Sequence, residues 1–234
     1  MISVCMATYN GELYIKEQLQ SILSQISEED EVVISDDGST DSTYDVVVRI
    51  NDSRIKWFVN EGVHGFTHNF ENALKHANGD IIFLSDQDDI WKDNKVKVSL
   101  EALSDSDFVI SDCVTVNNKM EIIQESRFKA FNIKNGFINH LIKSRYLGCC
   151  MAFKREVLDM ALPFPKNDRL VEHDIWLAAV GLLYFKVKLI EEPLILYRRH
   201  GNNVSDGGFE KGYSICNKIY RRIYRVAKLI TIRR

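Results

Sequence analysis

The sequence predicts an α/β fold in which a mostly parallel central sheet carries helices on both faces. Short apolar runs alternate with segments whose apolar residues recur at helical spacing. The apolar runs are nearly continuous, as strands are when both faces of a parallel sheet are buried. With 234 residues, of which 45% are hydrophobic, the chain is long enough to bury one large core.

Four strand–helix units follow one another in the N-terminal half. The expected strands cover residues 2–8, 31–35, 55–60 and 80–85. The expected helices cover residues 12–25, 44–50, 67–77 and 93–103. Ser39 and Asp41 are candidate N-caps for the second helix. Each strand ends in polar residues, and parallel strands bring such ends to one edge of the sheet, where ligands bind.

The second half is less regular. We expect strands within residues 107–116 and 148–153, helices over 134–143 and 171–183, and a strand pair over 185–199 that is broken at Pro193. Residues 1–208 are predicted to form one compact domain. The tail, residues 209–234, is predicted to be a helix with one apolar side and one basic side. Its apolar side comprises Ile215, Ile219, Ile223, Val226 and Ile230.

The charge distribution argues against nucleic acid as a partner. The formal net charge is −3, yet Lys211 to Arg234 contains eight basic residues and no acidic one. The rest of the chain is therefore strongly acidic, whereas a nucleic-acid surface needs basic residues clustered on the body. A basic amphipathic tail fits either a membrane surface or an oligomer contact.

The cysteines and the apolar runs predict a cytoplasmic location. The five cysteines form no CxxC pair, which fits a reducing compartment. The start "MISVCMATYN" lacks the basic residues and the long apolar run of a signal peptide. No apolar run approaches the ~20 residues of a membrane span, so we expect at most peripheral contact with the inner face of the cell membrane, through the tail.

Three carboxylates follow the fourth expected strand in "FLSDQDDIW", namely Asp86, Asp88 and Asp89. Carboxylates this close repel one another unless a cation offsets the repulsion, and oxygen ligands suit Mg²⁺ or Mn²⁺. An EF-hand is excluded because Trp91 stands where its loop needs glycine. A solvated acidic turn remains an alternative. A phosphotransferase with an aspartate nucleophile is disfavoured because the second half supplies no convincing further acidic pair.

A second acidic strand end lies in "SDDGSTD". Asp36 and Asp37 follow the second expected strand and can accept hydrogen bonds from a base or a ribose. The alternative is an ordinary capping turn. Two acidic strand ends on one sheet edge indicate a nucleotide diphosphate that binds through a metal ion.

Six motifs in order resemble glycosyltransferase family 2, which has the GT-A fold. They are "TYNG", "VVISDDGSTDST", "ANGDIIFLSDQDDIW", "GCCMAF", "EHDIW" and "YRRHGNNVS". The "DQDDIW" form resembles the bacterial rhamnosyltransferase-like branch, which builds capsule, O-antigen and cell-wall polysaccharides. The resemblance spans about Ile2 to Ser205. It implies an inverting, metal-dependent transferase that moves a sugar, with dTDP-L-rhamnose as the expected donor, to a glycan or lipid-linked glycan.

The resemblance also implies a donor site. Its expected members are Thr8, Tyr9, Asp36, Asp37, Asn69, Asp86 and Gln87. In this pattern Thr8 and Tyr9 flank the nucleobase, Asp37 with Asp36 accepts from the base, and Asp86 lies near the ribose. Many relatives have an Arg-Asn pair in the helix before the fourth strand, and Asn69 is the substitute here.

The resemblance assigns the metal and the base to three further residues. Asp88 is expected to bind Mn²⁺ or Mg²⁺, and His200 to bind the metal or the diphosphate. Asp174 in "VEHDIW" is the expected general base, although an aspartate at a helix start is also favoured by the helix dipole.

Two other classes of function fit the sequence less well. A nucleotidyltransferase that forms sugar nucleotides would need a basic, glycine-rich loop after the first strand, and "TYNGELY" is not one. A non-catalytic nucleotide-sugar binding module would not need Asp174.

Overall fold

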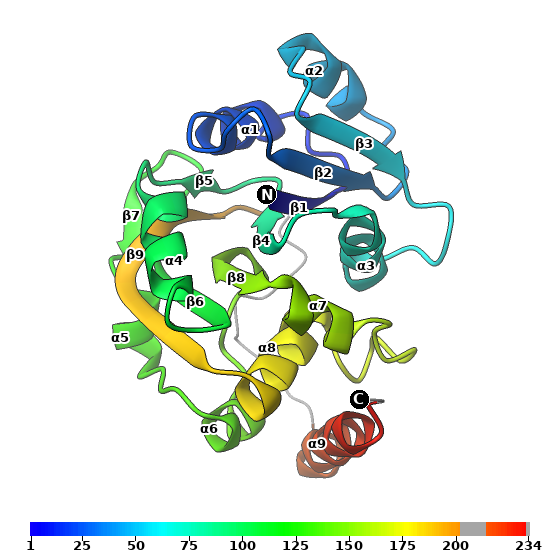
Figure 1. The fold of residues 1–234 in the computed structure, drawn as a ribbon, viewed down its shortest axis with the longest axis vertical. Coiled ribbons are helices and arrows are strands. Elements are labelled where there is room, and N and C mark those ends of the chain that lie inside the picture. Colours follow the sequence, from blue (N-terminus) through cyan, green and yellow to red (C-terminus); the bar gives the residue numbers. More distant parts are fainter. Residues whose placement is uncertain (202–213, 233–234) are drawn as a thin grey trace.

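The computed structural model describes residues 1–201 and 214–232. In these residues nine strands form one mixed sheet at the centre of the molecule (Figure 1). The strand order is β3-β2-β1-β4-β8-β6-β9-β5, with β7 paired to β6. Most paired residues are parallel, and helices cover both faces. The predicted α/β fold is confirmed.

The N-terminal half matches the prediction element by element. Its strands are β1 (Ile2–Thr8), β2 (Glu31–Asp36), β3 (Ile55–Val59) and β4 (Ile81–Asp86). Its helices are α1 (Ile15–Leu23), α2 (Thr43–Ile50), α3 (Phe66–His76) and α4 (Lys95–Leu103). β1 to β4 pair in parallel, so their carboxyl ends meet at one edge. β1 and β2 are almost fully buried because helices pack on both sides of them.

The second half completes the sheet. Its strands are β5 (Ile90–Trp91), β6 (Phe108–Asn117), β7 (Ile122–Gln124), β8 (Met151–Lys154) and β9 (Val187–Arg199). Its helices are α5 (Arg127–Phe131), α6 (Phe137–Ile142), η1 (Gly148–Cys150), α7 (Arg155–Ala161), α8 (His173–Tyr184) and α9 (Ile215–Ile230).

Two expectations for this half were wrong. The segment predicted as a strand pair is one strand, β9, which stays paired to β6 past Pro193. The register shifts there: Ser111 pairs with Ile190, and the next residue, Asp112, pairs with Pro193. A bulge of this kind accommodates a proline, which has no N–H for the ladder. The run "GCCMAF" begins as the 3₁₀ turn η1 and becomes a strand only at Met151.

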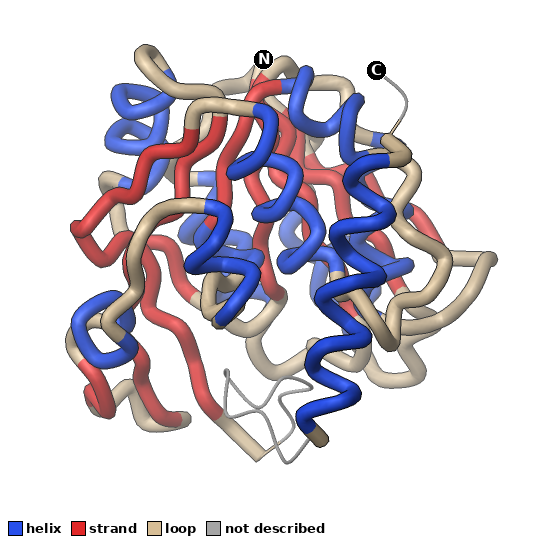
Figure 2. The backbone as a smooth tube through the Cα atoms, turned by 90° about the horizontal axis from the view of Figure 1, so that it is seen from below, coloured by secondary structure: helices blue, strands red, loops and turns tan. Residues whose placement is uncertain are grey.

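The helices form two outer layers (Figure 1). α1, α2 and α4 lie on one face of the sheet, and α3, α7 and α8 lie on the other. α8 packs against α3, α6, α7 and α9. α9 lies outside α8, at the front of the view from below (Figure 2). The Tyr184 hydroxyl of α8 donates to the Leu229 carbonyl of α9 over 2.7 Å, which fastens this helix to the body.

The orientation of α9 is opposite to that of an ordinary surface helix. Its buried residues are Arg221, Arg225 and Leu229, while Ile215 and Ile223 are 77% and 61% exposed. Within the predicted tail, residues 215–230 form the helix α9, with Arg221 and Arg225 turned to the body. The predicted boundary at residue 209 lies outside the described residues. In the part of the chain that the structure describes, no helix is long and apolar enough to cross a membrane.

Candidate active site

The candidate residues gather where β1, β2 and β4 end. Thr8 closes β1, and its hydroxyl donates to Asp36 Oδ1 at the end of β2 over 3.0 Å. In the sheet register Thr8 pairs with Asp36, and Ala7 pairs with Asp86. The sheet therefore brings these three strand ends together, as the sequence predicted.

Asp36 is buried, and hydrogen-bond donors of the protein occupy the acceptor sites of its carboxylate. Oδ1 accepts from the hydroxyls of Thr8 and Ser39. Oδ2 accepts from the backbone N–H groups of Gly38 and Ser39, at 3.1 and 2.8 Å. An ionised carboxylate offers about four lone-pair sites, and all are taken here. Asp36 thus holds the turn that follows β2, and its contact with a nucleobase stays a prediction.

Asp37, the next residue, keeps acceptor capacity. Its Oδ1 accepts from Asn60 Nδ2 at 2.8 Å and lies 3.1 Å from His64 Nδ1. Its Oδ2 accepts from the Gly65 N–H at 2.7 Å. Three partners leave about one lone-pair site for a ligand. The carboxylate is thus fixed in place by the protein and still able to accept.

Tyr9 and Gln87 are joined through the Tyr9 backbone. Gln87 Oε1 accepts from the Tyr9 N–H and Gln87 Nε2 donates to the Tyr9 carbonyl, both over 3.0 Å. A Cβ at Gly11 would lie 2.3 Å from Gln87 Oε1, so a larger residue there would displace the Gln87 side chain. The Tyr9 side chain is 54% exposed and available to a ligand.

Asn69 lies in the first turn of α3 and is buried. Its Nδ2 donates to the Thr8 carbonyl at 3.0 Å, and its Oδ1 accepts from the Ser35 hydroxyl at 2.6 Å. These bonds tie the ends of β1 and β2 to α3. Its predicted contact with the donor stays a prediction.

The acidic turn after β4 places carboxylates close together in a desolvated position. One side-chain oxygen each of Asp86 and Asp89 lies within 4.8 Å of the other and of Cys149 Sγ. Burial, then the Asp88 and Asp174 charges, raises the pKa of Asp86 to about 8. Burial, then Asp88, raises the pKa of Asp89 well above its usual range. Ionising the cluster without a cation is therefore unfavourable.

Asp88 and His200 meet across 112 residues of chain. His200 Nε2 lies 2.7 Å from Asp88 Oδ2, and both side chains are largely buried. The His200 ring also stacks on Tyr14, with ring centroids 4.8 Å apart. The two residues predicted to bind metal are thus neighbours in space.

Arg198 holds this turn, and our sequence analysis did not single it out. Its backbone N–H donates to Asp89 Oδ1 at 2.9 Å, and its Nε donates to the Asp88 carbonyl at 3.0 Å. Its guanidinium also pairs with Glu17 at 2.6 Å. The available signal was its position two residues before His200, because alternate residues of an extended segment lie on the same side.

Asp174 lies in the first turn of α8, and its charge acts on Asp86 of the same cluster. Its Oδ1 accepts from the Ile175 N–H at 2.6 Å. Burial, then the Glu172 charge, raises the pKa of Asp174 to about 7, against the opposing effects of the Ile175 N–H, Arg225 and Arg127. Asp174 also raises the pKa of Asp86, so the two carboxyl groups interact. A carboxylate with this pKa can exchange a proton near neutral pH.

Two buried residues beneath the cluster were also missed. Lys95 is 1% exposed; its Nζ donates to the Cys149 carbonyl at 3.3 Å and lies 5.0 Å from the Trp91 ring. Cys149 is fully buried, and its sulfur lies beside Asp86 and Asp89. The spacing of Lys95 and Cys149 along the sequence does not indicate that they lie beside the acidic residues.

The residues present fit a divalent cation. Asp89 Oδ2 is buried and has no hydrogen-bond partner within the described residues. Asp86 and Asp89 lie close enough to share an ion, and the turn 86–89 is held in place by Arg198. Oxygen ligands of this kind suit Mg²⁺ or Mn²⁺.

Comparison with known proteins identifies the family. The model of glycosyl transferase family 2 matches residues 3–161. The chain belongs to glycosyltransferase family 2. It is therefore a glycosyltransferase, and the resemblance noted in the sequence is confirmed. The match ends before Asp174 and His200, so their roles are argued from geometry.

The chain is similar in sequence to two bacterial glycosyltransferases. It is 29% identical over 244 residues to the dTDP-rhamnosyl transferase RfbG of Shigella flexneri, covering 93% of this chain and 81% of that protein. It is 30% identical over 182 residues to the UDP-Glc:alpha-D-GlcNAc-diphosphoundecaprenol beta-1,3-glucosyltransferase WfgD of Escherichia coli, covering 76% and 69%. The chain spans 66% of an uncharacterized glycosyltransferase of Nostoc sp..

Solved structures share the fold. S. aureus TarS in complex with UDP superposes with a TM-score of 0.71 at 22% identity, covering 98% of this chain and 65% of that one. The mannosyltransferase PcManGT of Pyrobaculum calidifontis, in complex with GDP-Man and Mn²⁺, gives 0.67 at 23% identity, covering 100% and 65%. The chain thus spans less than two thirds of these structures, and its GT-A fold is confirmed.

The raised pKa of Asp174 predicts a stability change with a defined sign. A raised pKa favours folding at low pH, and this contribution is lost as pH rises from about 4 through about 7. Asp174→Asn should therefore raise the melting temperature at pH 8, by on the order of 5 °C, with the difference shrinking toward pH 4. Differential scanning calorimetry across this range measures it.

Asp52→Asn is the matched control for that prediction. Hydrogen bonds from Arg54 lower the pKa of Asp52, so removing the Asp52 charge should destabilise the protein at pH 8. An Asp174→Asn protein that is less stable than the wild type at every pH would contradict the burial of a costly charge at Asp174.

Proposed function

We propose that this glycosyltransferase moves a sugar from a pyrimidine nucleotide diphosphate to a lipid-linked glycan, with inversion at the anomeric carbon. The observation that carries the proposal is the position of Asp174, a carboxyl group with a pKa of about 7, opposite the acidic cluster that ends β4. A single displacement needs a general base for the acceptor hydroxyl and a site for the leaving diphosphate, and we place both at this edge of the sheet.

Asp37 favours a base that donates a hydrogen bond. Its carboxylate accepts from Asn60 and from the Gly65 N–H, lies 3.1 Å from His64 Nδ1, and has room for one more donor. Uracil and thymine present an N–H between two carbonyls, whereas cytosine presents an acceptor at that position. The relatives named above use dTDP and UDP sugars, which supports this class. dTDP-L-rhamnose is our proposed donor, with the exposed Tyr9 ring against the base.

The acidic turn is the proposed diphosphate end of the site. Asp88 and His200 would hold Mn²⁺ or Mg²⁺, with Asp86 and Asp89 beside them. When bound, the cation neutralises negative charge on the diphosphate without a proton. Arg198 fixes the turn through the Asp88 carbonyl and the Asp89 carboxylate, so the protein holds the acidic side chains ready before the donor arrives.

Asp174 is the proposed general base. It takes the proton of the acceptor hydroxyl as that oxygen attacks the anomeric carbon, and the bond to the diphosphate breaks on the opposite face. The Ile175 N–H bonded to its Oδ1 orients the carboxylate. Its raised pKa makes it a stronger base than an ordinary aspartate while it remains ionised in part at neutral pH.

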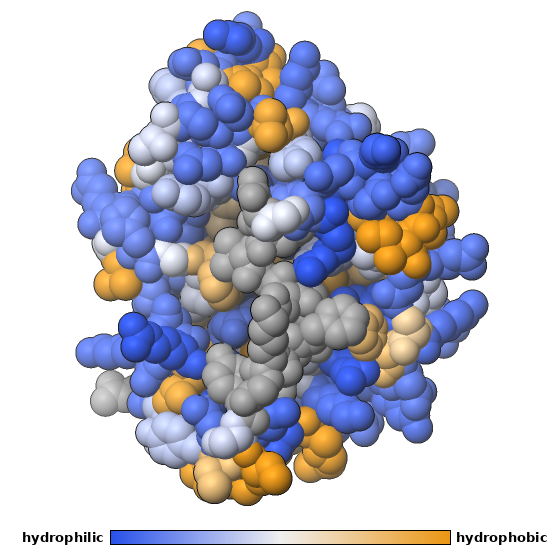
Figure 3. Space-filling view, turned by 180° about the vertical axis from the view of Figure 1, so that it is seen from behind, coloured by the Kyte–Doolittle hydropathy of each residue, from blue (hydrophilic) through white to orange (hydrophobic). Residues whose placement is uncertain are grey.

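The acceptor is proposed to be lipid-linked and to be met at a membrane surface. WfgD acts on a diphosphoundecaprenol-linked sugar, as its name states. α9 turns its isoleucines outward, and α6 beside it exposes Ile138 and Ile142. Hydrophobic side chains gather at the lower edge of the molecule (Figure 3), where Figure 1 places α6 and α9. Basic residues of α9, Lys218, Arg222 and Lys228, flank the exposed isoleucines and suit anionic headgroups.

A nucleotide panel tests the donor site. dTDP or UDP with Mn²⁺ should raise the melting temperature, since a ligand at a hundredfold excess over its Kd adds about 2.7 kcal/mol to the stability. CDP and GDP should raise it less, and Asp88→Ala should abolish the metal-dependent shift. Asp93→Ala removes an exposed carboxylate nearby and should leave the shift intact. No shift with any nucleotide in folded protein contradicts the proposal.

Asp174→Asn tests the base. Turnover should fall by about 10²–10⁴-fold while the nucleotide-dependent shift in melting temperature persists. In the wild type, turnover should rise with pH through about 7, because the base must be unprotonated. A radiolabelled donor and a lipid-linked acceptor give the rates. Full activity in Asp174→Asn would remove Asp174 from the mechanism.

Vesicle flotation tests the membrane contact. The wild type should float with vesicles containing anionic lipid, and Ile219→Ser with Ile223→Ser should reduce the bound fraction several-fold. Val48→Ser with Ile122→Ser, which changes two exposed apolar residues elsewhere, is the control. Equal loss in both double variants, or no flotation of the wild type, rules out α9 as the contact.

A further inference from the structure

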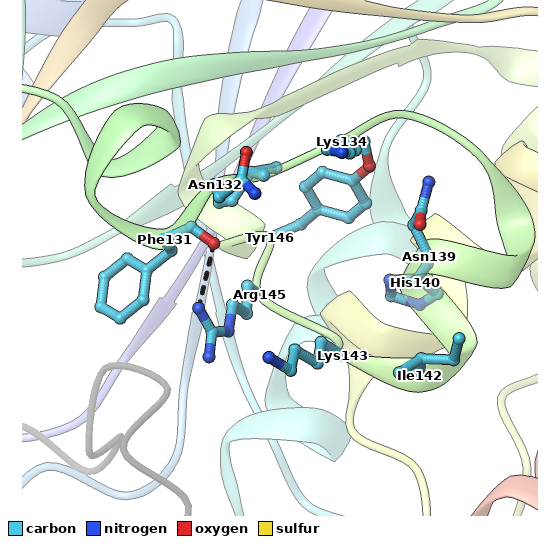
Figure 4. A pocket seen from close by; sticks show the side chains of 10 residues that line it. Phe131, Asn132, Lys134, Asn139, His140, Ile142, Lys143, Arg145 and Tyr146 are labelled. Carbon is cyan, nitrogen blue, oxygen red and sulfur yellow. Dashed lines mark hydrogen bonds between the residues drawn. The ribbon is translucent and has the colours of Figure 1, made fainter.

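A cationic pocket lies apart from the donor site. It has a volume of about 270 Å³ and is formed by α5, α6 and the two segments that follow these helices (Figure 4). Lys134, Lys143 and Arg145 line it, together with Asn132, Asn139 and Tyr146, and no acidic residue does. In Figure 4 Lys143 and Arg145 extend to the same side from one stretch of chain.

The positive charge of the pocket is not neutralised by the described protein. Among residues 1–201 and 214–232, Lys134, Lys143 and Arg145 form no ion pair within 4.0 Å. Arg145 is held in place, because its Nη1 donates to the Phe131 carbonyl at 3.1 Å and its guanidinium lies 4.9 Å from the Phe131 ring. Cations clustered in a concavity without acidic partners attract an anionic ligand.

The pocket borders α8 near the proposed base on one side and exposes an apolar residue on another. His140 lines the pocket, and its Nε2 atom lies 3.0 Å from the carbonyl oxygen of Ile175. Ile175 is the residue after Asp174. Ile142, also in its lining, is 56% exposed. Arg222 of α9 donates to the Leu141 and Ile142 carbonyls at 2.9 and 2.7 Å, so α9 abuts this end of α6.

We propose that this pocket binds the diphosphate group of the lipid-linked acceptor. The inference rests on the proposed function, since it names the part of the acceptor that the enzyme holds. Lys134, Lys143 and Arg145 would make charge-assisted hydrogen bonds to the phosphate oxygens. The lipid chain would leave past Ile142 toward the exposed face of α9, and the sugar would extend toward Asp174. A nucleotide's own diphosphate belongs at the acidic turn and is not involved.

Farnesyl diphosphate is a suitable probe, with inorganic pyrophosphate and farnesol as companions. Binding is measured by isothermal titration calorimetry below the micelle concentration, with EDTA present so that metal at the acidic turn contributes nothing. The wild type should bind farnesyl diphosphate more tightly than pyrophosphate and should not bind farnesol. Lys134→Gln with Lys143→Gln should weaken binding about tenfold or more, because two charged hydrogen bonds are lost.

Two controls make the test specific. Lys16→Gln with Lys97→Gln removes the same charge from exposed lysines on α1 and α4 and should leave the affinity unchanged. Asp88→Ala should also bind the probe normally, and the nucleotide panel reports separately on the donor site. The double variant Lys134→Gln with Lys143→Gln should keep the wild-type melting temperature, because neither lysine side chain has a hydrogen bond to a described residue.

Three outcomes overturn the inference. The first is equal weakening by both lysine pairs, which is non-specific charge attraction. The second is pyrophosphate binding as tightly as farnesyl diphosphate, which makes the pocket a site for free diphosphate. The third is no binding of farnesyl diphosphate to the wild type. If the nucleotide panel succeeds in that last case, only the acceptor pocket is wrong, and the proposed transferase stands.

Discussion

Mutual repulsion among desolvated carboxylates is the constraint on which the site depends. Asp86, Asp88 and Asp89 are consecutive but for one residue, and Asp174 reaches the same place from α8. Burial, followed by the charges of the neighbouring carboxylates, raises the pKa of Asp86 and Asp89. Arg198 holds the turn through the Asp88 carbonyl and the Asp89 carboxylate. The protein thus holds acidic groups in an arrangement that an added cation stabilises.

The sheet brings both ends of the proposed nucleotide site to one edge. β1 lies between β2 and β4, so the turn after β2 and the acidic turn after β4 flank the Thr8 end of β1. The two adjacent aspartates after β2 have different roles. The carboxylate of Asp36 accepts hydrogen bonds that hold the turn, whereas the carboxylate of Asp37 has one acceptor site left for a ligand. A rigid edge of this kind positions ligands without an ordering cost at each binding event.

The first half of the fold was readable from the sequence because each strand is a continuous apolar run ended by polar residues. Local periodicity could not show that β9 continues past Pro193, since the bulge depends on pairing with β6. It could not give the orientation of α9 either, because Arg221 and Arg225 are buried by contacts with distant segments. The acidic motifs were found from their spacing. Arg198, Lys95 and Cys149 were missed because only the tertiary fold brings them to the cluster.

The most direct test of this account is a Mn²⁺ titration followed by electron paramagnetic resonance, with the nucleotide that binds best present. The account predicts one tight Mn²⁺ per chain in the wild type, loss of that ion in Asp88→Asn, and its retention in Asp93→Asn. Absence of a tight ion in the wild type, or the same tight ion in Asp88→Asn, would contradict the claim that this acidic turn is built for a cation.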